Sequence, residues 1–308
     1  MPLRHRPLVV LCFAVLAVAH GAIFVRLAGD APALAVAAWR LTLATGIVLP
    51  LVLTRYSGGF GAFDFRIFLL LVGAGGLLAA HFATWITSLD YTSISNSVAL
   101  VSTAPLWVAL LGRLTGSLRL SPRMTWAVAL SVAGAIVIGA GSMRVGMSTL
   151  KGDLLALAGA ACMGGYLLVA QRIQRTLAFG PYVLLVYGIA ASFLWAAALV
   201  AGVPVRGFSA TTWWALIGIA VVSQVIGHSG YNWSLRHLRP DFVAVTLLGE
   251  PVLASLLGLF LFGERIPTAT LAGGAVILAA IAMAARAQLE EQRSNAASVA
   301  RSDNPAAT

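Results

Sequence analysis

Long apolar runs are the feature of this chain that most restricts its fold. Ten runs follow one another with short polar links, each close to the roughly 20 apolar residues that a helix needs to cross a bilayer. Only 10% of the residues are charged, against about 25% in soluble domains. The sequence therefore predicts an all-α membrane protein with ten transmembrane helices. The expected spans are 7–25, 32–53, 66–87, 92–112, 122–141, 152–170, 181–202, 211–235, 240–262 and 267–287.

The basic residues predict how the chain is oriented. They sit at the ends of the apolar runs, so the net charge of +10 indicates membrane topology and no nucleic-acid partner is expected. One set of links holds only Arg26, Arg144, Lys151, Arg206 and Arg265, and the other set, with both termini, holds the remaining loop arginines. By the positive-inside rule, both termini are expected to be cytoplasmic, in an inner (cytoplasmic) membrane.

The two halves of the chain are related by an internal repeat. A shift of 146 residues superposes the third and fourth spans on the eighth and ninth. The identities are Ser88/Ser234, Leu89/Leu235, Pro105/Pro251, Leu110/Leu256, Leu111/Leu257 and Gly112/Gly258, and Trp85 falls on Tyr231. We expect one repeat over 7–141, a second over 152–287, and a disordered cytoplasmic tail over 288–308. Because each repeat holds an odd number of spans, the halves are expected to be inverted, the architecture of secondary transporters.

An acid and a proline lie in the middle of the ninth span. Glu250 is costly at membrane depth unless it is paired or faces a polar cavity. Two interpretations are open: it binds a substrate ammonium or exchanges protons, or it is a static partner of Arg40, which is equally deep in the second span. Arg40 either holds a substrate carboxylate or anchors helix packing. Pro105 and Pro251 each remove a backbone hydrogen bond, so they predict either hinges or fixed bends.

Further motifs in the second half follow a known pattern. They are Gly230-Tyr231-Asn232-Trp233-Ser234-Leu235, Thr246 to Glu250 followed by Pro251, Leu256-Leu257-Gly258, Phe262-Gly263-Glu264 and Gly273-Gly274. Over residues 7–287 the chain resembles the drug/metabolite transporter (DMT) superfamily, specifically the ten-span EamA-type carriers, and within it the YddG-like amino-acid exporters. The resemblance implies transport of small metabolites or drugs, usually efflux, without ATP.

Polar and aromatic side chains gather on a few helical faces and predict a cavity. His81, Thr84, Trp85 and Ser88 share one face of the third span, and Gln224, His228 and Tyr231 share one face of the eighth. The alternatives are an interfacial aromatic belt for the first group and satisfied packing residues for single polar side chains. The candidate substrate-binding residues are His81, Trp85, Thr84, His228, Tyr231, Asn232, Glu250, Arg40, Asn96, Tyr166, Tyr187 and His20.

The expected substrate is a small molecule, most simply a neutral amino acid with an aromatic or apolar side chain. A phosphate ester would need several basic groups at the site, and only Arg40 is deep. A small multidrug-type cation, attracted by Glu250, is the main alternative. The segment Gly227-His228-Ser229-Gly230 also matches the Gly-x-Ser-Gly of rhomboid-type intramembrane proteases, although ten spans in two halves are not their plan. A channel or a structural membrane subunit is the third class, and we expect no enzyme.

No cofactor or metal is expected. The chain has no nucleotide-binding Gly-x-x-x-x-Gly-Lys loop, since its only lysine is Lys151, and it has no His-Glu-x-x-His motif. Small residues crowd the fifth and tenth spans, at Gly134, Gly139, Gly273 and Gly274. Such residues let helices approach closely, so they predict internal packing or a homodimer face.

Overall fold

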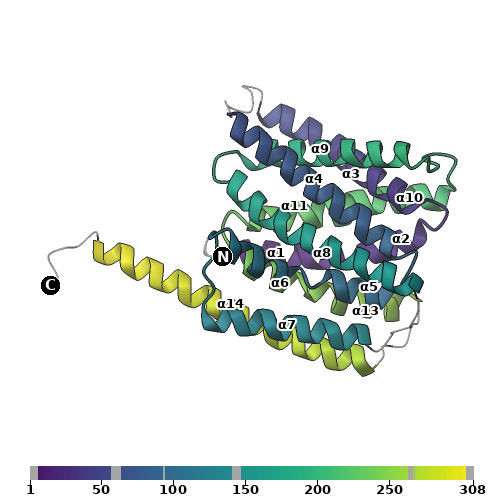
Figure 1. Ribbon diagram of the computed structural model, residues 1–308. Coiled ribbons are helices and arrows are strands. Elements are labelled where there is room, and N and C mark those ends of the chain that lie inside the picture. The colour runs from purple at the N-terminus through teal and green to yellow at the C-terminus, as the bar shows by residue number, and fades with distance from the viewer. Residues whose placement is uncertain are drawn as a thin grey trace.

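The computed structural model is a bundle of helices, and every element in its described part is helical (Figure 1). The structure describes residues 6–56, 64–92, 94–140, 147–262, 266 and 268–302. Glu264 and residues 303–308 of the tail lie outside these ranges, as does the side chain of Asn96. The helices are α1 (Arg6–Ala19), α2 (Gly21–Leu27), α3 (Ala33–Arg55), α4 (Phe65–Ser88), α5 (Ile94–Val101), α6 (Ala104–Leu114), α7 (Pro122–Ala140), α8 (Met147–Ile173), α9 (Phe179–Val200), α10 (Ala210–Gly218), the π-helix η2 (Ile219–His228), α11 (Ser229–Ser234), α12 (Pro240–Leu247), α13 (Gly249–Phe262) and α14 (Thr268–Ser302).

The ten expected spans correspond to continuous or interrupted helices. Among the described residues, nine helical stretches are long and apolar enough to cross a membrane. The fifth expected span is the shorter apolar helix α7, whose apolar part covers Pro122–Ile138. Four expected spans contain more than one helix: α1 with α2, α5 with α6, α10 with η2 and α11, and α12 with α13. The sequence thus predicted the apolar stretches but not their interruptions.

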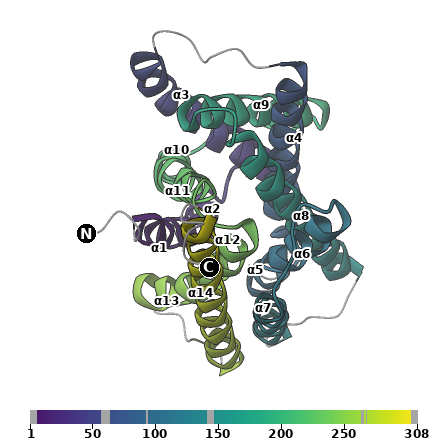
Figure 2. The same cartoon turned by 90° about the vertical axis from the view of Figure 1, so that its left-hand side faces the viewer.

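Most helix pairs in the bundle contain one helix from each half of the chain. The second span, α3, packs on the seventh, α9, and the fifth, α7, packs on the tenth, α14. The third span, α4, packs on α8 of the sixth, and in return η2 and α11 of the eighth pack on α1 of the first. Figure 2 shows α1 and α11 to α13 on one side of the bundle, and α4 to α6 with α8 on the other. This is the packing expected when each half is built on the same plan.

The fourth and ninth spans are interrupted at equivalent positions. The first break is Ser102-Thr103, between α5 and α6, and the second is Leu248, between α12 and α13. The repeat shift of 146 residues takes Ser102 onto Leu248. At both breaks the backbone tightens to i→i−3 hydrogen bonds, from Thr103 N to Leu100 O at 3.0 Å and from Leu248 N to Val245 O at 3.2 Å. Each break comes three residues before a repeat proline, so both halves bend at the same place.

Helices α7 and α14 approach so closely that their glycines are required. A Cβ added at Gly134 would lie 2.7 Å from the carbonyl oxygen of Gly273, and a Cβ at Gly273 would meet the carbonyl oxygen of Gly134. The small residues of the fifth and tenth spans are thus used, at these two positions, for contact inside one chain. A homodimer through other small residues stays a prediction.

We expect Gly134→Ala to destabilise the protein by about 1–3 kcal/mol, because the added methyl group meets the backbone carbonyl of Gly273, which cannot move aside, as well as the side chain of Ile277. Thermal melting of the purified protein in detergent measures the loss. The matched control is Gly73→Ala on α4, where an added Cβ has no atom within 4 Å. Equal melting of Gly134→Ala and the unchanged protein would show that the two helices do not pack in this way.

Helix α14 continues beyond the membrane-spanning stretch. The polar segment that begins at Gln288 is helical as far as Ser302. Its composition, in contrast, predicts disorder. Two ion pairs hold the start of this extension, from Glu290 to Arg123 on α7 and from Glu291 to Arg239 before α12. The extension is also rich in Ala, Glu, Gln and Arg, which favour helix. A composition rule for disorder cannot include these contacts, and this explains the difference.

Candidate functional site

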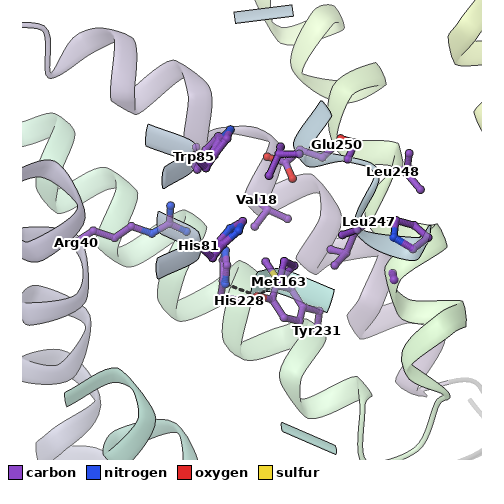
Figure 3. A pocket seen from close by; sticks show the side chains of 16 residues that line it. Val18, Arg40, His81, Trp85, Met163, His228, Tyr231, Leu247, Leu248 and Glu250 are labelled. Atoms are coloured by element: carbon purple, nitrogen blue, oxygen red, sulfur yellow. Dashed lines mark hydrogen bonds between the residues drawn. The ribbon is translucent and has the colours of Figure 1, made fainter. Parts of the chain in front are cut away.

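A cavity lies between the two halves, at the level of both helix breaks (Figure 3). We call it the central cavity. Its volume is about 50 Å³, which is small beside the roughly 300–1,000 Å³ of typical ligand pockets. It is lined by Val18, Gly21, Arg40, His81, Trp85, Val101, Ser102, Ala104, Pro105, Met163, His228, Tyr231, Ala244, Leu247, Leu248 and Glu250. In this conformation the cavity has room for a few water molecules only.

Equivalent residues of the two repeats line the central cavity in pairs. The pairs are Trp85/Tyr231, Val101/Leu247, Ser102/Leu248 and Ala104/Glu250. Pro105 and Pro251 have no N–H to offer the carbonyls of Val101 and Leu247, four residues earlier. Backbone carbonyls freed in this way are tolerated at membrane depth where they border a polar cavity. The site is therefore formed by equivalent positions of the two repeats. The pair Ala104/Glu250 differs most, because only Glu250 carries a charge.

Arg40 enters the central cavity from α3. Its side chain is only 1% exposed. The Nε atom donates a 2.7 Å hydrogen bond to Oε1 of Gln224 in η2, and the guanidinium carbon lies 4.0 Å above the centre of the Phe82 ring. The next residue on the chain, Trp39, packs edge-on against Trp195 and Trp213 and so holds this turn of α3. The Nε side of the guanidinium is thus fixed, while Arg40 lines the cavity.

Glu250 reaches the same cavity from the first turn of α13. The two charges lie on opposite sides of the group of side chains in Figure 3, with His81 between them. In the described structure the ion pairs do not include one between Arg40 and Glu250, so the static pairing considered from sequence is not formed. Gln224 and the Phe82 ring take the place of the carboxylate. Glu250 lies in the first turn of α13, where the helix dipole favours a negative charge and burial opposes it.

His81 and Trp85, both on α4, form one aromatic wall. Their rings stack nearly parallel, at 11°, with centroids 6.1 Å apart. Nδ1 of His81 lies 2.9 Å from the carbonyl oxygen of Gly159 on α8. A carbonyl only accepts, so Nδ1 carries the proton and Nε2 is left free as an acceptor when the ring is neutral. Nε1 of Trp85 is buried without a hydrogen-bond partner, so this wall offers one unused donor to a ligand or water.

His228 and Tyr231 form the facing wall. The Tyr231 hydroxyl is hydrogen-bonded to Nδ1 of His228. The neighbouring Ser229 is bonded to the Tyr187 hydroxyl at 3.1 Å and to the carbonyl oxygen of Gln224 at 3.4 Å. A serine protease needs its nucleophile hydrogen-bonded to a histidine, and Ser229 has other partners here. The geometry gives the protease interpretation no support.

Three predicted binding residues, Tyr166, Tyr187 and Asn232, lie beside the central cavity rather than in its lining, and two of them share a buried network with Tyr182. We call Tyr166, Tyr182 and Asn232 the Tyr–Asn cluster. The Tyr166 hydroxyl donates to Oδ1 of Asn232 at 2.8 Å, and the Tyr182 hydroxyl donates to the Tyr166 hydroxyl at 2.9 Å. Tyr187 is bonded separately, to Ser229. Tyr166, Tyr187 and Asn232 are therefore satisfied inside the protein, which was the alternative for single polar residues in the membrane.

Two other predicted residues also lie outside the lining. The Thr84 hydroxyl donates to the carbonyl of Ala80 in its own helix, and Nδ1 of His20 lies 2.9 Å from the carbonyl of Leu16. Asn96 is not described beyond its backbone. Of the predicted binding residues, the structure brings six to the central cavity: Arg40, His81, Trp85, His228, Tyr231 and Glu250.

Sequence reasoning missed the residue that holds Arg40. Gln224 shares a helical face with His228 and Tyr231, yet it was not among the predicted binding residues. It lies in the π-helix η2, where the wider turn changes which side chains share a face. Propensity does not predict π-turns, but the placement of Gln224 on a polar face opposite a deep arginine was a usable signal. Met163, Val18 and Leu247 carry no such signal, because they are ordinary apolar residues of their helices.

Comparisons with known proteins agree on one family and one fold. A family model described as the EamA-like transporter family matches residues 6–140 and, a second time, residues 150–286. Two uncharacterized transporters of Archaeoglobus fulgidus are similar: one is 32% identical over 75 residues (24% of this chain, 28% of the relative), the other 24% identical over 198 residues (63% of this chain, 68% of the relative). A solved crystal structure at 20% identity superposes with a TM-score of 0.76, covering 92% of this chain and 99% of the other.

Proposed function

Because this chain belongs to the EamA-like transporter family, we propose that it carries a neutral amino acid with an aromatic or apolar side chain across the inner membrane. The proposed carrier exports its substrate by alternating access, without ATP, and has both termini in the cytoplasm. It is a transporter with no catalytic step of its own.

The observation that carries this proposal is the presence of Arg40 and Glu250 at one cavity without an ion pair between them. A zwitterion supplies the missing partner of each charge, a carboxylate for Arg40 and an ammonium for Glu250. Uncompensated charge at membrane depth is costly, so binding a zwitterion also relieves the protein. The aromatic or apolar side chain of the substrate would lie between two walls, one formed by His81 and Trp85 and the other by Tyr231. Both walls present rings that favour contact with such a side chain.

The small volume of the central cavity supports a transport cycle in which the site opens. At about 50 Å³ it must widen to admit an amino acid. The two breaks, at Ser102-Thr103 and at Leu248, border the cavity and interrupt the helices that would have to move. Helix-terminal residues of this kind absorb the backbone rotation of a hinge. We therefore propose hinge roles for the segments containing Pro105 and Pro251.

A small organic cation is the competing substrate. Glu250 and the faces of Trp85 and Tyr231 would attract it. Arg40, however, lines the same cavity and would repel it, and the cation would supply no negative charge to Arg40. The zwitterion uses both charges, and we therefore favour it.

The test is counterflow in proteoliposomes with three compounds that share one ring. They are phenylalanine, phenethylamine, which lacks the carboxylate, and 3-phenylpropionate, which lacks the ammonium. We expect internal phenylalanine to stimulate uptake of labelled phenylalanine about tenfold more than either analogue does, because each analogue loses one charge-assisted contact. Empty liposomes are the control. Equal or stronger stimulation by phenethylamine would identify a cation carrier, and no stimulation by any of the three would contradict the proposal.

A further inference from the structure

A second cavity lies at the ends of three elements. It is bordered by the C-terminal end of α8, the link between α11 and α12, and the part of α14 that follows the membrane-spanning stretch. We call it the basic cavity. Its volume is about 690 Å³, within the range of small-molecule sites at roughly 300–1,000 Å³. Unlike the central cavity, it has a volume sufficient for an amino acid.

Two buried amides line the basic cavity without hydrogen-bond partners. Gln174 is 5% exposed, and neither its Nε2 nor its Oε1 is bonded. Gln288 is 4% exposed, and its Oε1 is unbonded. Buried polar groups in native proteins are nearly always paired, with protein or with bound molecules. Together the two side chains offer donors and acceptors, which suits a ligand that carries both.

The charges around the basic cavity favour an anionic group. Arg175 and Arg236 line it, and neither is in an ion pair in the described structure. Arg239 differs, because it is held by Asp241, at 2.9 Å, and by Glu291. Partial burial, and then the charge of Arg236, lower the pKa of His237, so this ring is neutral at pH 7. Because Arg175 and Arg236 have no acidic partner among the described residues, their guanidinium groups can bind a carboxylate.

The two cavities lie along the same helices. On α8, Met163 lines the central cavity and Gln171 lines the basic cavity. On α11, Tyr231 lines the central cavity, and Leu235, at the end of this helix, lines the basic cavity. The residues between them on these helices include Tyr166 and Asn232, which are fully buried and hydrogen-bonded in the Tyr–Asn cluster. The cluster thus separates two sites that a substrate could occupy one after the other.

We propose that the basic cavity is a second binding site for the transported amino acid, in which Arg175 and Arg236 hold the carboxylate and the amides of Gln174 and Gln288 bind the ammonium and remaining polar atoms. The identity of the ligand rests on the proposed function, whereas the site itself rests on the cavity, the unpaired amides and the arginines. On the orientation proposed above, the site opens to the cytoplasm and is occupied before the central cavity.

The test counts phenylalanine sites by equilibrium dialysis on the purified full-length protein in uncharged detergent. We expect two sites per chain. The double variant Arg175→Gln/Arg236→Gln is expected to keep only the central site, and Arg40→Gln to keep only the site in the basic cavity. The matched control is Arg113→Gln/Arg172→Gln, which removes two exposed arginines that do not line the cavity and is expected to keep both sites.

The outcomes separate the two proposals. One site in the unchanged protein, lost in Arg40→Gln and kept in Arg175→Gln/Arg236→Gln, overturns the second site and leaves the proposed function intact. A site lost only in Arg175→Gln/Arg236→Gln supports the basic cavity and contradicts the central assignment. An anionic lipid headgroup offers the same kind of charge, so dialysis is repeated in nanodiscs with and without phosphatidylglycerol. Loss of the second site wherever that lipid is present would assign the cavity to lipid and overturn the proposal.

Discussion

Replacement of Arg40 by glutamine is expected to lower phenylalanine counterflow by about 100-fold. The variant removes the charge that would hold the substrate carboxylate, and a hydrogen bond to a charged group contributes about 1.5–3 kcal/mol. It also removes the donor that now bonds Oε1 of Gln224. Arg40→Lys is not expected to restore transport, because an ammonium cannot reproduce the fork that binds Gln224 and a carboxylate together. The measurement is the initial rate of labelled phenylalanine exchange in proteoliposomes.

Loss of folding must be distinguished from loss of binding in this variant. Arg55→Gln is the matched control, because Arg55 is an exposed arginine at the end of the same helix. We expect it to exchange phenylalanine at the unchanged rate. Arg40→Gln is also expected to lose its discrimination against phenethylamine, a result that a merely unfolded protein cannot give. Normal phenylalanine exchange by Arg40→Gln would remove Arg40 from the site.

Glu250→Gln is expected to raise the KM for phenylalanine about tenfold, which corresponds to about 1.4 kcal/mol of binding free energy. The amide keeps the size and polarity of the side chain but removes the charge that attracts the ammonium. Discrimination against 3-phenylpropionate should fall at the same time, because this analogue has no ammonium to lose. Concentration-dependent exchange of both compounds provides the two values.

The control for Glu250→Gln is the same substitution at Glu290, whose carboxylate forms an ion pair at the protein surface. Glu290→Gln removes the exposed partner of Arg123, and exposed ion pairs contribute only about 0–1 kcal/mol. We expect its KM to be unchanged. If Glu250→Gln binds phenylalanine as tightly as the unchanged protein, the carboxylate has a structural role and the zwitterion proposal is wrong.

Much of the fold could be predicted because the signals are long and repeated. Twenty-residue apolar runs, the proline pair Pro105/Pro251 and the aromatic pair Trp85/Tyr231 each recur, so a single error in one half is corrected by the other. Interruptions within a span are different. The breaks at Ser102-Thr103 and Leu248 and the π-helix η2 change only the hydrogen-bond pattern of a few residues. Hydropathy does not register such local changes.

Within the site, the sequence predicts which charged residues lie deep in the membrane, but it does not predict which side chains they contact. A charge in the middle of an apolar run, as in Arg40 and Glu250, marks a buried polar site wherever it occurs. Whether the two charges meet depends on rotations between helices that are far apart in the chain. Gln224 reaches Arg40 across 184 residues of sequence, and Asn232 is turned to Tyr166 rather than to the cavity. Such choices are made by packing and not by the pattern of one span.

In the proposed alternating-access cycle, the equivalent breaks of the fourth and ninth spans affect the free energies of the two end states. Segments with the same local geometry bend at similar cost, so exchanging the roles of the halves leaves the free energy of the protein almost unchanged. Glu250 opposite Ala104 is the clearest inequality between them at the cavity. When the two end states are nearly equal in free energy, neither is strongly preferred by the empty protein. In the proposed cycle, the empty carrier would then open to the two sides of the membrane about equally often.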